Sequence, residues 1–345
     1  MEIGILTQGF VRSDSTAQER IREVVAEARY ADEMGLAAFG VSEQHFKFPV
    51  NSTAPITTIM AAIAQCTEQI KIIPGVVILP FHHPLTVAEN WAAIDIISKG
   101  RLYFGVGKGN TPFTSDVYRV PIKDTVPLSD EVLEIIIRSW TEEKFSFDGK
   151  FFQIPELSLC PQPWKRPHPP LGSAGNSIPA ARYAGDRKLG FMTGTLVDSW
   201  EDVQSWLDAY DAAWETGKPI ASATPDKTKS VLVPGWVGDN YDEVSAQAGD
   251  GTMRYVNRYV EYKRVVADRS GTPNPTYGEA FLDNFQVIYD TMPNAFGTPD
   301  LVIKKLRRMK EMGFDRVDVT LDYAKHEDIL KCIKRLATEV MPALN

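Results

Sequence analysis

The feature that most constrains the fold is the alternation of short apolar segments with helical patterns along nearly the whole chain. The apolar segments are uniformly apolar, which is typical of strands buried on both faces of a parallel sheet. The predicted strands are residues 3–6, 37–41, 70–79, 102–106, 171–174, 191–194, 229–237 and 316–321. Each is followed by at least one helical pattern, so we predict an α/β fold, a (β/α)₈ TIM barrel. An open doubly wound sheet is the alternative, and the regularity of the alternation favours the barrel.

The alternation loosens in two places. Residues 111–170 contain a helical pattern at 130–140 and a hairpin-like stretch, KFSFDGKFFQIP, and long helical excursions follow residue 241. We therefore expect insertions after the fourth and seventh strands of one barrel domain that spans residues 1–345.

Composition excludes several classes of function. The formal net charge of the 345 residues is -8, which argues against a broad basic face for nucleic acid or an anionic membrane. Cys66, Cys160 and Cys332 lie far apart without a paired motif, which favours a reducing compartment. The first residues lack a signal-peptide pattern, and the sequence has no apolar run of about 18 residues, so we expect a cytoplasmic protein without a membrane span.

Three polar residues follow the second predicted strand, in the stretch GVSEQHF. They are Glu43, Gln44 and His45, and in such barrels the chemistry lies at the carboxyl ends of the strands. Glu43 and His45 would point the same way if the strand continued, and Gln44 the opposite way unless the chain has already turned. An imidazole beside a carboxylate can hold and move a proton near neutral pH. A loop whose polar groups cap the next helix fits the same residues.

Two histidines follow the third predicted strand. His82 and His83 precede Pro84, which suits a first helical turn. Adjacent histidines on an extended segment cannot both face one small ligand. We include His83 among the cofactor-binding candidates and leave the choice between the two open.

Glycines and a lysine end the fourth predicted strand, in the stretch FGVGKGN. The spacing differs from the dinucleotide fingerprint, and no helix opens directly after it, so we reject a Rossmann site. Gly107 would let a ligand approach the backbone, Lys108 supplies a charge for phosphate, and Asn110 follows them. A tight turn with a solvated lysine is equally consistent with these residues.

A possible phosphate turn follows the fifth predicted strand, in the stretch GSAGNSIPAARYAG. Gly175, Asn176 and Ser177 lead into a helix with Pro179 in its first turn. Backbone N–H groups at a helix N-terminus bind phosphate. Asn176 or Ser177 is also a favourable N-cap, and both roles are compatible.

Six segments in this order resemble the bacterial luciferase-like flavin monooxygenases. They are IGIL, SEQHF, ILPFHHPLTVAEN, SKGRLYFGVGKGN, GSAGNSIPAARYAG and FGTPDLVIKKLRRMKEMGFDRVDV. The resemblance implies a barrel that binds reduced FMN as a co-substrate, delivered by a separate flavin reductase. It further implies that O₂ adds at the flavin 4a carbon, and that the hydroperoxide oxygenates a ketone, an aldehyde or an aromatic compound. Members of the family are usually homodimers.

The resemblance also implies roles for individual residues at the flavin ring. His45 would face the ring or the bound oxygen species, with Glu43 orienting it and Gln44 holding a carbonyl. Luciferase has a histidine at the position of Gln44 and a cysteine at the position of Gly107, so light emission from long aldehydes is not expected.

At the other end of the cofactor, the resemblance places the phosphate on Lys108 and on the turn of residues 175–177. It also implies a cis peptide bond between Gly75 and Val76, against the flavin.

Three alternatives stay open. The first is a deazaflavin-dependent oxidoreductase of the same superfamily. The second is a metal-dependent hydrolase on the same barrel, with Glu43, His45 and Asp318 or Asp322 as ligands; the lack of a His-x-His motif in the first strand argues against it. The third is a flavin-binding protein without turnover. We assign no metal, and the sequence does not identify the substrate.

Overall fold

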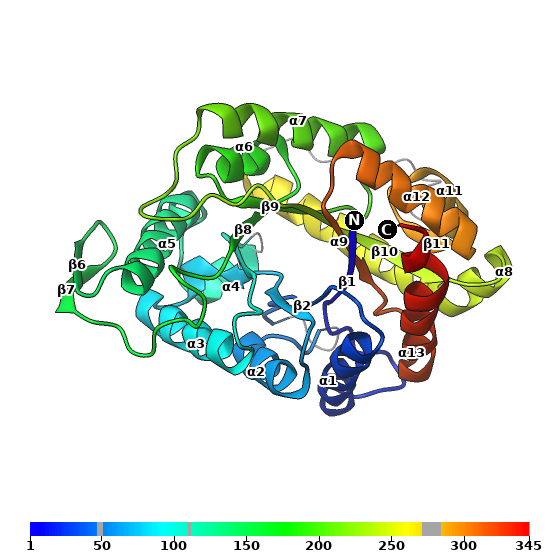
Figure 1. The fold of residues 1–345 in the computed structure, drawn as a ribbon. Helices are drawn as coiled ribbons and strands as arrows, with labels where there is room; N and C mark the ends of the chain where they lie inside the picture. Colours follow the sequence, from blue (N-terminus) through cyan, green and yellow to red (C-terminus); the bar gives the residue numbers. More distant parts are fainter. Residues whose placement is uncertain (47–50, 110–111, 271–283, 345) are drawn as a thin grey trace.

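The structure is a computed structural model that describes residues 1–46, 51–109, 112–270 and 284–344. Its centre is a ring of parallel strands with helices outside it (Figure 1). The strands follow the order β3-β2-β1-β12-β10-β9-β8-β5-β4, and β11 pairs with β10. They are β1 (Glu2–Thr7), β2 (Ala38–Val41), β3 (Lys71–Pro74), β4 (Val77–Ile78), β5 (Phe104–Gly107), β8 (Leu171–Ala174), β9 (Gly190–Gly194), β10 (Lys229–Val237), β11 (Ala295–Gly297) and β12 (Arg316–Thr320). The predicted barrel is confirmed.

The third predicted strand is not continuous. It divides into β3 and β4 at a cis peptide bond between Gly75 and Val76, the bond that the family resemblance implies. β4 pairs with β5, and a bridge between Ile72 and Leu102 joins β3 to the segment before β5. These contacts nearly close the ring.

Most of the surrounding helices begin and end where the sequence predicts. They are α1 (Ala17–Glu33), α2 (Ile56–Cys66), α3 (Pro84–Ile97), α6 (Ile178–Asp186), α7 (Trp200–Thr216), α12 (Pro299–Met312) and α13 (His326–Arg335). A capping box of Thr16 and Glu19 starts α1, and Gly313, with a φ of 103°, ends α12.

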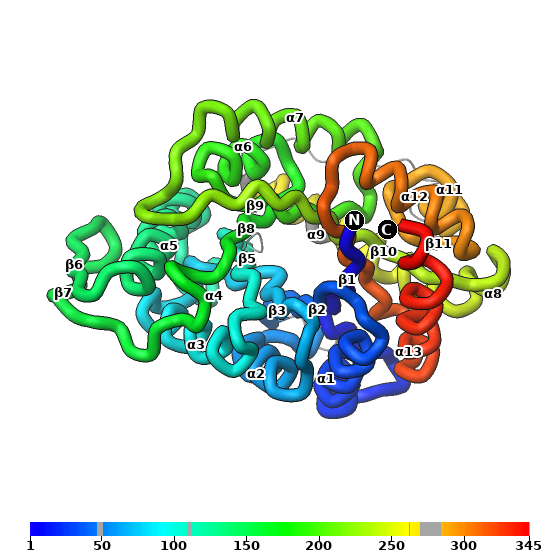
Figure 2. The backbone as a smooth tube through the Cα atoms, viewed as in Figure 1, coloured from blue at the N-terminus to red at the C-terminus, as the bar shows by residue number. Residues whose placement is uncertain are grey.

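Additional elements separate β5 from β8 and β10 from β12. The first set is α4 (Pro112–Val117), α5 (Thr125–Thr141) and the hairpin of β6 (Phe145–Asp148) and β7 (Gln153–Leu157), which extends away from the barrel in Figure 2. The second set is α8 (Tyr241–Val244), α9 (Asp250–Ser270) and α11 (Phe285–Thr291). The helix predicted at 130–140 thus begins earlier, at Thr125.

Short turns complete the fold. They are η1 (Leu79–Phe81), η2 (Ile122–Asp124), η3 (Ser245–Gly249), η4 (Leu336–Val340) and η5 (Met341–Ala343). The terminal helix predicted at 327–340 is therefore divided, because α13 ends at Arg335 and the wider turn η4 follows it.

Residues inside the ring are smaller or more polar than those facing the helices. Ile3 and Ile5 pack outward, whereas Gly4 faces inward, where a Cβ atom would lie 2.3 Å from Asp318 Oδ1. Asp318 is buried and accepts hydrogen bonds from Arg316 Nε. Among the described residues, no helix is both long and apolar enough to cross a bilayer.

Candidate functional site

A cavity of about 410 Å³ opens at the carboxyl ends of the strands. This volume is within the usual range for a site that binds a cofactor or a small molecule. Its lining includes ten of the predicted site residues: Glu43, Gln44, His45, Gly75, Val76, Gly107, Lys108, Gly175, Asn176 and Ser177. Asn110 lies outside the described residues. The strand-end argument thus brings together segments that are far apart in the sequence.

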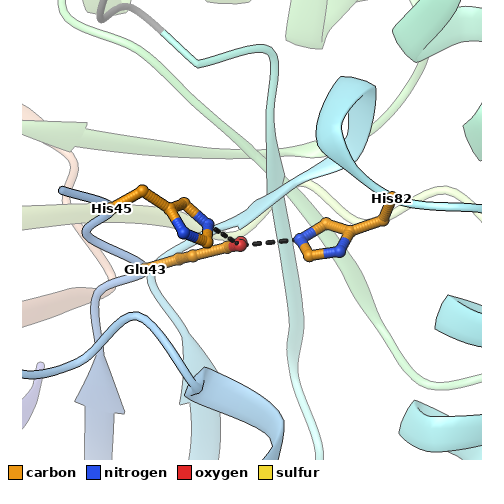
Figure 3. Close-up of side chains that lie close together, drawn as sticks. All are labelled: Glu43, His45 and His82. Atoms are coloured by element: carbon orange, nitrogen blue, oxygen red, sulfur yellow. Dashed lines mark hydrogen bonds and ion pairs between the residues drawn. The ribbon is translucent and has the colours of Figure 1, made fainter. Parts of the chain in front are cut away.

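The Glu43 carboxylate organises one side of this cavity (Figure 3). Its side chain is fully buried, and its Oε1 atom lies 2.6 Å from Nε2 of both His45 and His82. The other oxygen, Oε2, accepts a hydrogen bond of 2.7 Å from the backbone N–H of Ile78 in β4. The residues after β2 are therefore tied to β4 and to the turn that follows it.

The charge of Glu43 fixes the direction of these hydrogen bonds. Burial raises the pKa of the Glu43 carboxyl, but hydrogen bonds from His45, His82 and Ile78 outweigh burial and leave the pKa lowered. An ionised carboxylate only accepts hydrogen bonds, so each imidazole must carry a proton on Nε2. The Nδ1 atom of a neutral His45 is then an acceptor.

Tyr118 faces this Nδ1 atom. Its hydroxyl lies 3.4 Å from His45 Nδ1, and its ring stacks on Phe81 with centroids 4.7 Å apart. Burial and the charge of Glu43 raise the pKa of Tyr118, so it is an O–H donor at neutral pH. A chain of proton-bearing groups therefore runs from Tyr118 through His45 to Glu43.

The structure distinguishes the two adjacent histidines, and the assignment of His83 to the cavity is wrong. His82 points toward Glu43, whereas His83 is exposed at the start of α3 and its ring contacts Phe152. The reason is geometric, because successive side chains of an extended segment point in opposite directions.

Gln44 lines the same cavity as its two neighbours. β2 ends at Val41, so the chain has left the strand before Glu43, and strand alternation no longer applies. The Gln44 amide donates a hydrogen bond of 2.7 Å to Ser42 Oγ.

The opposite end of the cavity is suited to an anion. Lys108 is exposed directly after β5, and no ion pair joins it to another described residue. The N-terminus of α6 lies at the same cavity, with Ser177 as its N-cap. The Asn176 amide donates to the Tyr259 hydroxyl at 2.8 Å, which holds the turn against α9.

Comparison with known proteins decides the family. The profile described as luciferase-like monooxygenase matches residues 1–316. The chain belongs to the luciferase-like monooxygenase family.

Relatives in this family act on different substrates. The chain is 24% identical over 341 residues to the oxygenase component of a flavin-dependent trigonelline monooxygenase from Acinetobacter baylyi, covering 97% of this chain and 93% of the relative. It is 25% identical over 356 residues to limonene 1,2-monooxygenase from Rhodococcus erythropolis, covering 100% and 87%.

Solved structures support the fold. The oxygenating constituent of 3,6-diketocamphane monooxygenase from Pseudomonas putida, in complex with FMN, superposes with a TM-score of 0.80 at 21% identity and covers 99% of this chain and 98% of that one. A coenzyme F420-dependent tetrahydromethanopterin reductase from Methanopyrus kandleri gives 0.76 at 17% identity, covering 100% and 99%. Flavin and deazaflavin enzymes therefore share this architecture.

Two features of this luciferase-like chain fit the phosphate and ring of a flavin. The cation and the helix N-terminus suit a phosphate, and glycines at positions 75 and 107 leave the wall between the two ends of the cavity without bulky side chains. Lys263 of α9 is a second cation on the lining. Helix α9 lies in one of the long connections, where the sequence gave no signal for a site.

A metal site is the other chemistry that this group of side chains allows. The ligand atoms of Glu43, His45 and His82 lie within 4.8 Å of one another. The ligand set suggested by the sequence is wrong, however, because Asp318 pairs with Arg316 and Asp322 pairs with Arg20. Both aspartates are therefore occupied by buried cations.

Proposed function

We propose that this chain is the oxygenase of a two-component, FMN-dependent monooxygenase. It takes reduced FMN from a separate flavin reductase, uses O₂, and oxygenates a small organic substrate such as a ketone, an aldehyde or an aromatic compound. One observation carries the proposal: a single cavity has an anion-binding end at Lys108 and α6 and a proton-holding group of Glu43, His45 and His82 elsewhere on its lining. The proposal includes a homodimer in the cytoplasm, with residues 1–345 as one domain.

Each part of the cavity has a distinct task in this proposal. Lys108 and the turn of residues 175–177 hold the phosphate, and residues 75, 76 and 107 lie along the ring. Reduced FMN, when bound, supplies the electrons that activate O₂. His45 holds a proton near the reacting oxygen, Glu43 keeps the imidazole oriented, and the hydroxyl of Tyr118 can replace a proton at Nδ1. Gln44 can donate or accept a hydrogen bond but cannot take up a proton at neutral pH.

Binding of reduced FMN is the first test. Under anaerobic conditions, Lys108→Ala should weaken the affinity for reduced FMN, whereas Lys150→Ala removes an exposed lysine on the distant hairpin and should leave the affinity unchanged. Equal affinities in the two variants would contradict the phosphate assignment.

The second test is the rate of oxygenation after O₂ is mixed with the protein and reduced FMN. His45→Ala should slow product formation by about a hundredfold, because a positioned general acid–base contributes 10²–10⁴. His83→Ala is the matched control, since this neighbouring histidine lies outside the cavity. If His45→Ala leaves both flavin affinity and oxygenation rate unchanged, His45 is structural.

The deazaflavin alternative is supported by the structural similarity to an F420-dependent reductase. Such an enzyme transfers hydride and needs no oxygen. Substrate reduction by reduced F420 in the absence of O₂, together with no product from reduced FMN and O₂, would favour it.

A further inference from the structure

A second, smaller cavity adjoins the first one. It measures about 100 Å³, and we call it the side pocket. It shares Asn176, Gly194 and Leu232 with the large cavity. The rest of its lining is Gln8, Thr195, Leu196, Pro234, Tyr255, Tyr259, Thr320 and Tyr323. These residues lie on α9 and at the ends of β1, β9, β10 and β12, across the ring from β4 and β5. A molecule in the large cavity can therefore extend one end into it.

The side pocket contains hydroxyl groups that are available to a ligand. Thr320 and Tyr323 are 2% and 6% exposed, and their hydroxyls face one another without a hydrogen bond of normal geometry to any described residue. Even if one donates to the other, the pair retains one O–H. Tyr255 accepts a hydrogen bond of 2.6 Å from Gln8 Nε2, which leaves its own hydrogen to donate. At least two O–H donors thus point into a space large enough for more than one water molecule.

The charge distribution selects against an anion. The lining of the side pocket contains no lysine or arginine, so a buried carboxylate there would lack a cationic partner. The buried carboxylate of Asp322 lies directly behind Gln8, whose backbone N–H it accepts at 2.5 Å. Burial raises the pKa of both Tyr255 and Tyr323, which keeps these groups as donors at neutral pH.

We propose that the side pocket binds the carbonyl oxygen of a neutral, largely apolar substrate. A carbonyl oxygen accepts two hydrogen bonds, which matches the available donors. The rings of Tyr255, Tyr259 and Tyr323 provide apolar walls for the carbon skeleton. The inference rests on the proposed function in taking the occupant to be the substrate. The other carbonyl source, the flavin ring itself, is distinguished by the experiment.

Three ring compounds of nearly the same shape test the chemistry: cyclohexanone, methylenecyclohexane and cyclohexanecarboxylate. Ligand-observed NMR titration of the full chain, under anaerobic conditions with and without reduced FMN, gives the affinity for each. Cyclohexanone should bind about fivefold to tenfold more tightly than methylenecyclohexane, since one or two net hydrogen bonds are gained. Cyclohexanecarboxylate should bind more weakly than cyclohexanone.

Isosteric variants locate the preference. Thr320→Val combined with Tyr323→Phe should remove most of the preference for the ketone and leave the affinity for methylenecyclohexane unchanged. Tyr289→Phe is the control, because it removes a tyrosine hydroxyl that lines neither cavity. Thermal denaturation confirms that each variant is folded, and Tyr255→Phe provides an independent loss of one donor.

The outcomes separate this proposal from the function on which it rests. Equal binding of ketone and hydrocarbon by the unmodified chain, tighter binding of the carboxylate, or an unchanged preference in all the variants would overturn the carbonyl site. A loss of affinity for reduced FMN alone would assign the donors to the flavin and also overturn it. A ketone preference in flavin-free protein that neither binds reduced FMN nor forms product would instead refute only the monooxygenase.

Discussion

Replacing Glu43 by glutamine should reverse the protonation of two imidazoles rather than simply remove an interaction. The carboxylate now accepts hydrogen bonds from His45, His82 and the Ile78 backbone. In Glu43→Gln the amide oxygen can still accept from Ile78, and the NH₂ group then faces both Nε2 atoms. All the contacts survive only if both histidines move their protons to Nδ1, so that Nε2 accepts.

The magnitude follows from comparing glutamine with leucine at this position. Hydrogen bonds to a charged group contribute about 1.5–3 kcal/mol, neutral ones about 0.5–1.5 kcal/mol, and the lost charge also removes a burial cost, so Glu43→Gln should cost about 1 kcal/mol. Glu43→Leu leaves the buried Ile78 N–H and the two imidazoles without an acceptor. His82 is 32% exposed and can reach water, so we expect about 3 kcal/mol.

Two measurements check this prediction. ¹⁵N NMR of the histidine side chains should show Nε2–H in the unmodified chain and Nδ1–H for both residues in Glu43→Gln. Urea denaturation at pH 7 should rank the unmodified chain above the glutamine variant, and the glutamine variant above the leucine variant. Unchanged ¹⁵N shifts, or glutamine and leucine variants of equal stability, would refute the reasoning.

The pH dependence gives an independent check on the same carboxylate. Its pKa is lower in the folded state, so the stabilisation is complete above the unfolded pKa of about 4.3 and is lost as pH falls through the folded pKa. The difference in stability between the unmodified chain and Glu43→Gln should therefore be constant near neutral pH and shrink below about pH 4.

Three further predictions concern charged residues. Arg20→Met leaves Glu27 without its buried partner and should cost about 3–5 kcal/mol in denaturation, whereas Lys331→Ala, at an exposed pair, should leave the midpoint unchanged. A hydrogen bond to Glu27 raises the pKa of His326, so this stabilisation is present below about pH 6.5 and lost as pH rises through the folded pKa; His326→Ala should therefore lower the denaturation midpoint more at pH 6 than at pH 9. For Lys108→Ala the loss of reduced-FMN affinity should be largest at low salt and diminish as ionic strength rises, which a salt titration measures.

The strand pattern was sufficient to predict the barrel because it depends on local composition and order. Residues 171–174 and 229–237 were predicted with the observed strand bounds. The break between β3 and β4 is different in kind, because apolar periodicity contains no information on peptide geometry, and only the family resemblance pointed to it. The early start of α5 at Thr125 has a similar origin, since the first residues of that helix include Pro127, which does not fit an interior helical pattern.

The site was predictable where it lies next to a strand and not where it lies in a long connection. Glu43 and Lys108 directly follow apolar runs, so the carboxyl-end argument applies to them. Tyr118 and Tyr255 lie on helices of the connections after β5 and β10, and their approach to the cavity depends on chain paths that periodicity does not determine. The choice of His82 over His83 likewise required the direction of each side chain.

The buried charges at the rim and inside the barrel have different physical consequences. Arg316 and Asp318 pair within the ring, where an apolar pair of similar volume would be neutral or stabilising if packing alone mattered. Asp322 instead accepts hydrogen bonds from Thr7 and from the Gln8 backbone while Arg20 of α1 pairs with it at 2.9 Å. Gln8 in turn contacts Tyr255, so this ion pair connects an outer helix to the wall of the side pocket. An apolar replacement at the rim would therefore release that wall even if the chain became more stable, and the cost of burying these charges is understood as the cost of positioning it.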